Sequence, residues 1–224
     1  MRTRSAVTDA VLGRCRELGF ALAGIADAAP THYAAELRQW LAAGKHGEMG
    51  YLEEHEAQFA DPQRLLEGAR AVICVADRYA AGDVSHEEAR TSMRGRIARY
   101  ARGCDYHVVM KRRLHQLCDE LAQVHPRERF RACVDTAPLL EREYAQRAGL
   151  GAIGKHTLLI EPGVGSYLLL GEVLTTLPLT PSDAVQRDVC GTCRRCIEAC
   201  PTNAISLFSV DATKCISYLT ICLL

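Results

Sequence analysis

The sequence lacks net charge, a long apolar run and internal repeats. Lys and Arg together number 27 and Asp and Glu number 27, so a whole-surface electrostatic contact with nucleic acid is not supported. No run of 18 apolar residues occurs, and the first twenty residues carry scattered charges instead of an apolar core. These absences argue against a transmembrane helix and a secretory signal. We therefore expect a globular protein of the cytoplasm that is not bound to a membrane.

Cysteine, in contrast, is abundant, with 11 residues. Five of them crowd into residues 190–215, and Cys222 follows closely. Because thiols stay reduced in the cytoplasm, a cluster of cysteines there indicates metal ligands or redox groups. The remaining five are scattered through the chain, and we expect them to be small core residues; they are Cys15, Cys74, Cys104, Cys118 and Cys133.

Helical and strand patterns alternate along the first 180 residues. Helices are predicted over 5–18, 32–43, 105–124 and 139–149, and strands over 20–25, 71–76, 129–134, 157–160 and 166–174. A polar loop is expected over 80–95. This order favours an α/β or α+β layered domain over residues 1–180. The stretch LPLTPSD at 177–183 is typical of a linker, and the cysteine segment at 181–224 follows it.

The cysteine segment contains CGTCRRCIEACP, with the spacing C-x2-C-x2-C-x3-C-P. Bacterial ferredoxins bind [4Fe–4S] clusters with this spacing, and the last cysteine of the run ligates the second cluster. Zinc is the alternative, but it usually takes two separated pairs of cysteines. The predicted ligands are Cys190, Cys193, Cys196, Cys200 and Cys215. Five ligands exceed the need of one cluster and fall short of two.

Several longer motifs resemble one family, the epoxyqueuosine reductases of tRNA queuosine synthesis. They are HGEM (46–49), RYARGCDYH (99–107), VDTAPLLERE (134–143), AGLGAIGKHTLLI (148–160), GSYLLLGE (165–172), CGTCRRCIEACPTNAI (190–205) and VDATKCISYLT (210–220). The resemblance implies an oxidoreductase that reduces the epoxide of epoxyqueuosine in tRNA. It also implies a cobalamin-binding domain over 1–180, similar to that of reductive dehalogenases, and a partial ferredoxin-like domain over 181–224.

The sequence departs from the family pattern in two places. Family members continue into a second cysteine triplet and a helical-repeat domain, so we expect this chain to be truncated. On this reading two [4Fe–4S] clusters are implied with an incomplete ligand set: Cys190, Cys193 and Cys196 lack a fourth ligand, and Cys200 and Cys215 lack two. Phe59 stands where the family commonly has an arginine, which is expected to weaken cobalamin binding if that arginine helps to hold the cofactor.

Asp135 is the candidate proton donor. It follows an apolar strand and lies in the VDTAP stretch, which matches the family motif of the proton donor. Epoxide reduction needs a general acid because the oxygen must be protonated as it leaves. A turn residue before Pro138, or an N-cap of the helix that begins near Leu139, is the alternative role.

Two further stretches are candidates for cofactor contact. One is a glycine turn, where backbone can approach a large planar cofactor; it contributes Gly154, Lys155, His156 and Thr157. The other is RYARGCDYH, with Tyr100, Asp105, Tyr106 and His107. Ser166 and Ser217 lie in matching motifs. The alternatives are a turn histidine at His156 and a helix N-cap at Asp105.

The expected partners are tRNA and an unidentified low-potential electron donor, and the chain is expected to be a monomer. A local basic region could meet RNA phosphate, although a solvated helix face explains it as well; its residues are Arg94, Arg96, Arg99, Arg102, Lys111, Arg112 and Arg113. The alternative function is a cobalamin and iron–sulfur electron-transfer module without its own tRNA chemistry. A bare ferredoxin does not explain the 180 residues before the cysteines.

Overall fold

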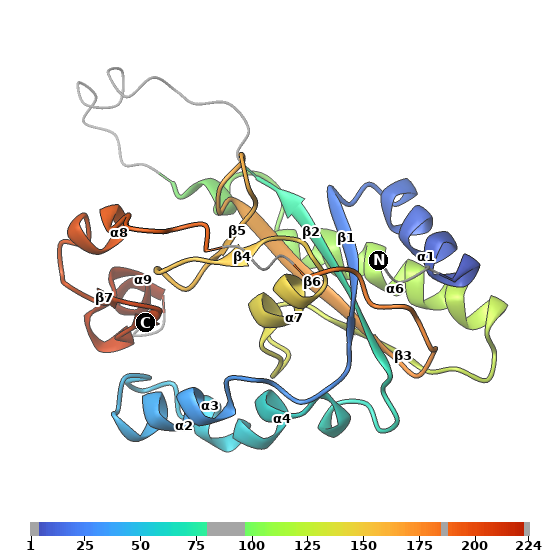
Figure 1. Cartoon of the computed structure of the whole chain (residues 1–224), viewed down its shortest axis with the longest axis horizontal. Helices are drawn as coiled ribbons and strands as arrows, with labels where there is room; N and C mark the ends of the chain where they lie inside the picture. Colours follow the sequence, from blue (N-terminus) through green and yellow to red (C-terminus); the bar gives the residue numbers. More distant parts are fainter. Residues whose placement is uncertain (1–4, 80–96, 185–187, 222–224) are drawn as a thin grey trace.

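The computed structural model describes residues 5–79, 97–184 and 188–221. A four-stranded sheet lies at its centre (Figure 1), in the order β1 (Leu22–Asp27), β2 (Ala71–Arg78), β6 (Leu168–Thr175) and β3 (Phe130–Cys133). All neighbouring strands in it are antiparallel. Mixed helices and strands in layers were predicted as α/β or α+β, and the antiparallel sheet agrees with the α+β form. The first six residues of β2, Ala71 to Ala76, are apolar and buried because both faces of the sheet are covered there, not because the sheet is parallel.

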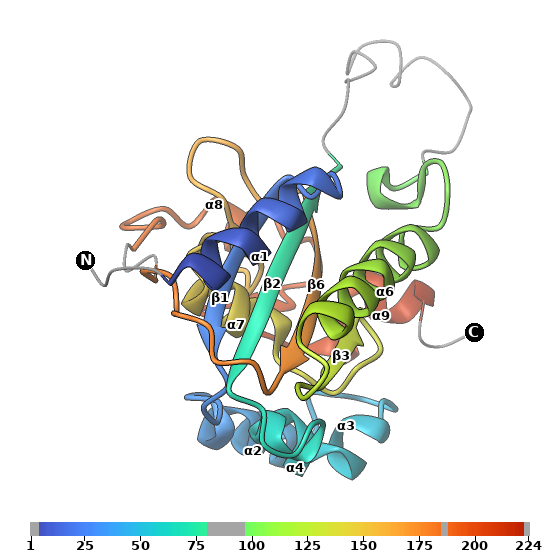
Figure 2. The ribbon, with the colours of Figure 1, turned by 90° about the vertical axis from the view of Figure 1, so that its right-hand side faces the viewer.

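One face of the sheet is covered by α1 (Ala6–Glu17) and α6 (Tyr106–Val124), which lie in front of it in Figure 2. Ser5 caps α1, since its hydroxyl accepts a hydrogen bond from the Thr8 amide at 3.2 Å, as its position predicted. Leu12 of α1 and Leu114 of α6 pack with Ile73 of β2 in one buried cluster. This layer holds the N-terminal end of α6, and the residues just before it, against the sheet.

The other face is covered by α7 (Glu141–Arg147) and by a two-stranded ribbon of β4 (Ala152–Ile153) and β5 (Leu159–Ile160). Tyr144 is fully buried there. The structure shortens the predicted helix at 139–149, because residues 135–140 form turns and Gly149 takes a φ of +82°. Helix α7 thus begins just after the loop that carries Asp135.

The helix predicted at 32–43 is present in the connection between β1 and β2 as α2 (Ala34–Ala42). Three short elements that the sequence pattern did not separate follow it: α3 (Tyr51–Glu54), α4 (Glu56–Ala60) and a 3-10 turn η1 (Pro62–Arg64). Figure 1 shows α2, α3 and α4 below the sheet. Another 3-10 turn, η2 (Arg99–Ala101), precedes α6. The predicted loop at 80–95 lies outside the described residues. None of the described helices is both long and apolar enough to cross a membrane.

The cysteine segment contains short elements: α8 (Arg195–Glu198), β7 (Ile205–Ser206), β8 (Ser209–Val210), η3 (Ala212–Lys214) and α9 (Ile216–Ile221). It docks on α2 and on the loop after it. The Trp40 indole donates to the Val210 carbonyl at 2.7 Å, and the Tyr218 hydroxyl accepts from the Glu48 amide at 2.7 Å. Gly47 is required here, because a Cβ would lie 2.5 Å from the Tyr218 hydroxyl.

Gly24 marks a close approach between β1 and α7, and it gives a test of the packing. A Cβ at Gly24 would overlap the Ala148 carbonyl oxygen and lie 2.8 Å from Leu150 Cδ1. We expect Gly24→Ala to lower the free energy of unfolding by about 1–3 kcal/mol, as overpacking does. The matched control is Gly13→Ala on α1, where a Cβ meets nothing within 4 Å and alanine should stabilise by about 0.5–1 kcal/mol. Urea unfolding measures both; equal stabilities of the two variants would contradict the packing.

Candidate active site

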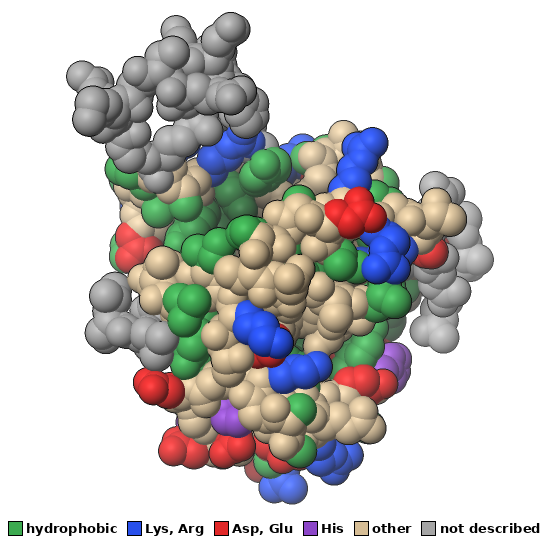
Figure 3. Space-filling view, turned by 90° about the vertical axis from the view of Figure 1, so that its left-hand side faces the viewer, with side chains coloured by type: hydrophobic (Ala, Val, Ile, Leu, Met, Phe, Trp, Pro, Cys, Tyr) green, Lys and Arg blue, Asp and Glu red, His purple; other side chains and the backbone are tan. Residues whose placement is uncertain are grey.

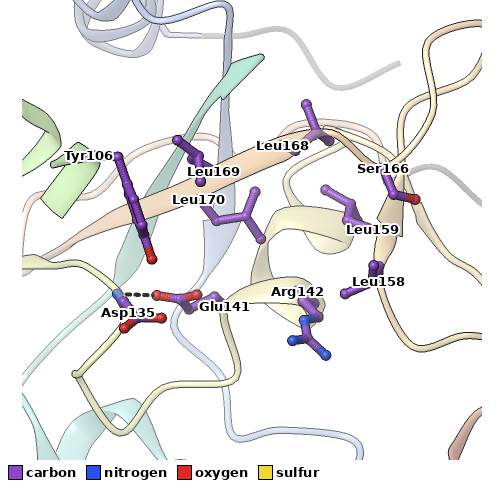
Figure 4. A pocket seen from close by; sticks show the side chains of 10 residues that line it. All are labelled: Tyr106, Asp135, Glu141, Arg142, Leu158, Leu159, Ser166, Leu168, Leu169 and Leu170. Atoms are coloured by element: carbon purple, nitrogen blue, oxygen red, sulfur yellow. Dashed lines mark hydrogen bonds between the residues drawn. The ribbon is translucent and has the colours of Figure 1, made fainter. Parts of the chain in front are cut away.

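A pocket of about 140 Å³ lies where the start of β6 meets α7 and the β4–β5 ribbon. Its walls differ in chemistry, as Figure 4 shows. Leucines make the apolar wall, and Asp135, Glu141 and Arg142 bring polar groups from the opposite side. The complete lining is Tyr106, Asp135, Glu141, Arg142, Leu158, Leu159, Ser166, Leu168, Leu169 and Leu170.

Asp135 lies in a strained loop between β3 and α7. Its φ is +53°, in the left-handed region that non-glycine residues rarely adopt. The backbone amide of Asp135 donates to Glu141 Oε1 at 2.7 Å, and the carboxyl group is 54% exposed at the pocket. Asp135 does not cap α7, whose N-cap is Leu140. The alternative of an N-cap is therefore wrong, and such strain is typical of functional loops.

His107 connects two carboxyl groups of the site. Its Nδ1 lies 2.7 Å from Asp105 Oδ1, and its Nε2 lies 3.2 Å from Asp135 Oδ2. Burial disfavours the charged ring, but the hydrogen bonds to Asp105 and Asp135 outweigh it and raise the pKa of His107. Because both ring nitrogens face carboxyl oxygens, the ring can donate to both as an imidazolium. Asp105 also caps α6 by accepting from the His107 amide at 2.9 Å, so its predicted N-cap role is confirmed.

Tyr106 lines the pocket beside His107. Burial, together with the negative charge of Asp135, raises the pKa of Tyr106 to about 12. The phenol therefore stays protonated at neutral pH and can donate a hydrogen bond into the pocket.

Glu141 is a site residue that the sequence reading missed. Burial raises its pKa to about 7, and the charge of Asp135 adds to this, although the hydrogen bond from the Asp135 amide opposes it. In the sequence it reads as one charge among several in LLEREYAQR. Its position six residues after Asp135 was the available signal, since a carboxylate at the first turn of a helix can reach back to the loop before it.

The glycine turn is tied to the cysteine segment. The Lys155 ammonium donates to the carbonyls of Gly191 and Cys193 at 2.6 and 3.0 Å, and the Lys155 amide donates to Cys190 Sγ at 3.4 Å. His156 accepts from the Leu158 amide at 3.1 Å and lies 3.5 Å from the Ser166 hydroxyl. Burial lowers its pKa, which fits the alternative of a neutral turn histidine.

Other candidate residues lie away from the pocket lining. Thr157 has a φ of +70° and accepts from Arg142 at 3.3 Å, whereas Gly154 is buried against Ile160. Tyr100 is 41% exposed, and Ser217 is exposed on α9. Among the residues that line the pocket, Tyr106 and Ser166 are those that were predicted to contact a cofactor, and Asp135 is the predicted acid.

Two further expectations concern residues outside the pocket. Phe59 lies half-buried on α4 and is not among the lining residues. The basic region is not uniform, because Arg113 pairs with Asp77 and stacks over Phe20 with a guanidinium–ring distance of 4.3 Å. Arg94 and Arg96 lie outside the described residues.

The clustered cysteines lie before, within and after α8 along the chain, and Cys190 contacts the glycine turn through the Lys155 amide. Cys193 is exposed, and Cys190, Cys196, Cys200 and Cys215 are half-buried. A hydrogen bond with Thr202 is the main cause that lowers the pKa of Cys200 to about 7, and the Ala204 amide donates to its sulfur at 3.3 Å. Within the described ranges no three His, Cys, Asp or Glu side chains converge as a site for a single metal ion. Cys222 lies outside those ranges.

The scattered cysteines behave mostly as expected. Cys15, Cys74 and Cys133 are buried, and burial raises the pKa of the Cys15 and Cys133 thiols to about 12. Cys118 is half-buried. Cys104 is exposed, so its predicted core position is wrong. Cys104 lies just before α6 begins, so it is not part of the buried face of that helix.

Two family models match the chain. One, described as epoxyqueuosine reductase QueG, DUF1730, matches residues 60–136, and one described as a 4Fe–4S double cluster binding domain matches residues 189–223. An epoxyqueuosine reductase of Pseudomonas aeruginosa is 42% identical over 92% of this chain and 58% of its own length. One of a Synechococcus species is 43% identical over 99% of this chain and 68% of its own length. The chain thus spans little more than half of the Pseudomonas relative.

Solved structures agree with this. An epoxyqueuosine reductase bound to an epoxyqueuosine-modified tRNA stem loop matches at 30% identity with a TM-score of 0.84, over 95% of this chain and 56% of that one. An epoxyqueuosine reductase from Bacillus subtilis, with its catalytic aspartate loop swung out of the active site, matches at 28% identity with a TM-score of 0.81, over 95% of this chain and 56% of that one. A reductive dehalogenase with a B12-dependent mechanism shares the fold at 17% identity with a TM-score of 0.53, over 94% of this chain and 29% of that one. This chain belongs to the epoxyqueuosine reductase family.

Proposed function

We propose that this chain reduces the epoxide of epoxyqueuosine in tRNA to the alkene of queuosine. The observation that supports this proposal is the position of Asp135. Its exposed carboxyl is held at the mouth of the pocket by His107, and its backbone amide is held by Glu141. Membership of the family and the tRNA-bound relative support the assignment. We divide the chain into a catalytic domain at 1–180 and an iron–sulfur domain at 181–224.

We propose that cobalamin is the cofactor and that this pocket, at about 140 Å³, takes up only one edge of its ring. Cobalamin presents an apolar ring with amide and phosphate groups at its edge, and it would supply a strongly reducing centre when bound. The leucine wall suits the ring, and the exposed Arg142 and the Ser166 hydroxyl suit the polar edge. On the side toward which α8 projects, the surface is hollowed and apolar side chains gather around the hollow (Figure 3). Lys155, in contrast, serves to hold the cysteine segment in place.

Asp135 is the proton donor in this proposal. The oxygen of an opening epoxide takes up a proton, and a carboxyl at the pocket mouth can deliver it. The protonated Tyr106 can donate a hydrogen bond to the same oxygen, because it lines the same pocket. In the Bacillus relative the catalytic aspartate loop is swung out of the active site, and we propose that the loop of Asp135 is its counterpart. The strained φ of Asp135 is consistent with a loop that adopts two positions.

The cysteine segment is proposed to carry electrons to the pocket. Its thiols suit iron–sulfur ligation, with Cys190, Cys193 and Cys196 for one cluster and Cys200 and Cys215 for another. A low-potential protein donor would supply the electrons one at a time. We expect the protein to act as a monomer in the cytoplasm, with tRNA as its partner.

The test is anaerobic reconstitution followed by measurement of bound iron, bound cobalt and reduction of an epoxyqueuosine stem loop. The proposal expects cobalt near one per chain and conversion to queuosine with a chemical reductant. Cobalt uptake without conversion would favour the alternative of an electron-transfer module without tRNA chemistry. A chain that takes up no cobalamin would contradict both functions.

A further inference from the structure

The proposed reaction consumes two protons, and the proposed function assigns Asp135 to deliver them. Conversion of an epoxide to an alkene takes two electrons and two protons: both C–O bonds break, the C=C bond forms and the oxygen leaves as water. The electrons come from a one-electron, low-potential iron–sulfur donor. Because a carboxyl group carries a single acidic proton, Asp135 must regain one between the two transfers.

His107 contacts the carboxyl group of Asp135 directly, side chain to side chain. Its Nε2 lies 3.2 Å from Asp135 Oδ2, within hydrogen-bond distance. On the other side of the ring, Nδ1 lies 2.7 Å from Asp105 Oδ1. When the ring is charged, Nδ1–H donates to Asp105 and Nε2–H donates to Asp135. A single hydrogen bond therefore connects a ring proton with the candidate acid.

The start of α6 fixes the direction of this ring. Asp105 accepts from the His107 amide at 2.9 Å as well as from the ring, so one carboxylate holds both the backbone and the side chain of His107. The ring lies beside that of Tyr106, with centroids 3.9 Å apart and planes inclined by 30°. Helix α6 itself packs on the sheet through Met110 and Leu114. Nε2 is thus held toward the mouth of the pocket.

The surroundings of His107 favour a stored proton. Burial lowers the pKa of His107, but the hydrogen bonds to Asp105 and Asp135 outweigh it and raise that pKa above its ordinary value. The groups that face the ring are Asp105 at the start of α6, Asp135 in the loop after β3, Glu141 on α7 and the neutral Tyr106. Negative charge on the three carboxyl groups stabilises the imidazolium. The side chain is 33% exposed, so solvent can reload it.

We propose that His107 is a proton relay that recharges Asp135 between the two protonation steps of epoxide reduction. This inference rests on the proposed function. Asp135 gives its proton to the epoxide oxygen as the first C–O bond breaks. His107 then passes its Nε2 proton to the Asp135 carboxylate, and solvent water reloads the ring. Asp135 gives this second proton to the hydroxyl group, which leaves as water while the C=C bond forms.

The bound substrate promotes the transfer from His107 to Asp135. A substrate at the pocket mouth removes water from Asp135, whose other neighbours in the pocket include a wall of leucines. Loss of water raises the free energy of an imidazolium facing a carboxylate, relative to a neutral ring facing a carboxylic acid. Asp105 keeps the remaining proton on Nδ1, since the hydrogen bond from His107 lowers the pKa of Asp105. His107 is a positioning residue, because it acts through Asp135.

NMR titration of the histidine rings tests the relay in the purified chain without turnover. The signal that is missing from His107→Gln identifies the ring. We expect its pKa to lie above that of a free histidine, with both ring nitrogens protonated below it. Asp105→Asn and Asp135→Asn should each lower this pKa, because each removes a negative charge and keeps the size of the side chain. Asparagine also caps a helix well, so α6 is retained.

The matched control for the titration is Asp61→Asn, which removes the charge of another capping aspartate. It should leave the pKa of His107 unchanged. A His107 ring whose pKa moves in neither Asp105→Asn nor Asp135→Asn would overturn the proposal.

Turnover on the epoxyqueuosine stem loop separates a relay from a residue that only orients Asp135. In His107→Gln the side-chain amide can still donate to Asp135, but it has no proton to pass on. We expect kcat of this variant to fall about tenfold or more, with KM unchanged. In the unmodified protein, kcat should decline as the pH rises through the pKa of His107. This decline should be absent from His107→Gln and shifted to lower pH in Asp105→Asn.

Added imidazole supplies a further readout. It should restore part of kcat in His107→Ala, because the ring position is partly open to solvent, and it should restore none in Asp135→Asn. Rescue of Asp135→Asn, or a pH profile of His107→Gln equal to that of the unmodified protein, would sink the relay and leave the function standing. A raised His107 pKa in a chain that converts no stem loop would overturn the proposed function, and the relay with it.

Discussion

Asp135→Asn is expected to slow epoxide reduction about 10²–10⁴-fold, the contribution of a positioned general acid. The amide keeps the size of the carboxyl and its contact with His107, yet it has no acidic proton to give. Asparagine also tolerates the left-handed backbone better than most residues, so the φ of +53° is retained. Single-turnover conversion of the stem loop by the reconstituted protein measures the rate.

The control for this variant is Asp61→Asn. Asp61 caps η1 through the Gln63 amide, outside the pocket lining, and asparagine caps equally well. Its conversion rate should equal that of the unmodified protein. If Asp135→Asn converts the stem loop at the full rate while cobalamin is bound, Asp135 is not the acid.

Glu172 of β6 has no solvent exposure, and both its carboxyl oxygens lack a hydrogen-bond partner among the described residues. Glu172→Gln is therefore expected to change the pH dependence of folding. Because the folded pKa of Glu172 is raised, the folded state binds one more proton than the unfolded state above the ordinary pKa. Stability is therefore highest at acidic pH and declines as the pH rises toward the folded pKa, by about 1.4 kcal/mol per pH unit. Glutamine has no such proton. The free energy of unfolding of Glu172→Gln, relative to that of the unmodified protein, should therefore rise at that rate from about pH 5.

Denaturant unfolding at several pH values measures the difference in the free energy of unfolding between the variant and the unmodified protein. Ionisable groups that the substitution does not affect contribute equally to both proteins and cancel. Glu141→Gln is the comparison variant. The pKa of Glu141 is raised to about 7, so the difference in the free energy of unfolding between Glu141→Gln and the unmodified protein should stop widening near pH 7. Parallel curves for Glu172→Gln and the unmodified protein would show that the buried group is already ionised or solvated.

The sequence identified Asp135 but neither Glu141 nor the buried Glu172. Asp135 was visible because it ends an apolar strand within a specific motif. Glu141 was hidden because a charge near a helix start is ordinary, and only the loop geometry brings it back to Asp135. Glu172 offered a better signal, a lone charge within the apolar run LLLGEVL, yet a strand pattern does not tell whether such a residue faces solvent at an edge or lies at the centre of a sheet.

The fold, too, was predicted only in part from the sequence. The alternating pattern located α1, α6 and the main strands, because their apolar faces are long enough to show periodicity. It could not set the strand directions, since β2 and β6 are covered on both faces and read like parallel strands. The short helices α3 and α4 were missed, because four or five residues carry too little periodicity to detect.

The docking of the cysteine segment on α2 and on the loop after it has a consequence for how the chain reaches its native state. Trp40 and Val210, and Glu48 and Tyr218, are each separated by 170 residues. During synthesis on the ribosome, the loop at Gly47 cannot form its contact with Tyr218 until nearly the whole described chain has been made. Such distant pairings add closure entropy and slow folding. The region around α2 should thus be the last to gain protection from amide exchange during synthesis and refolding.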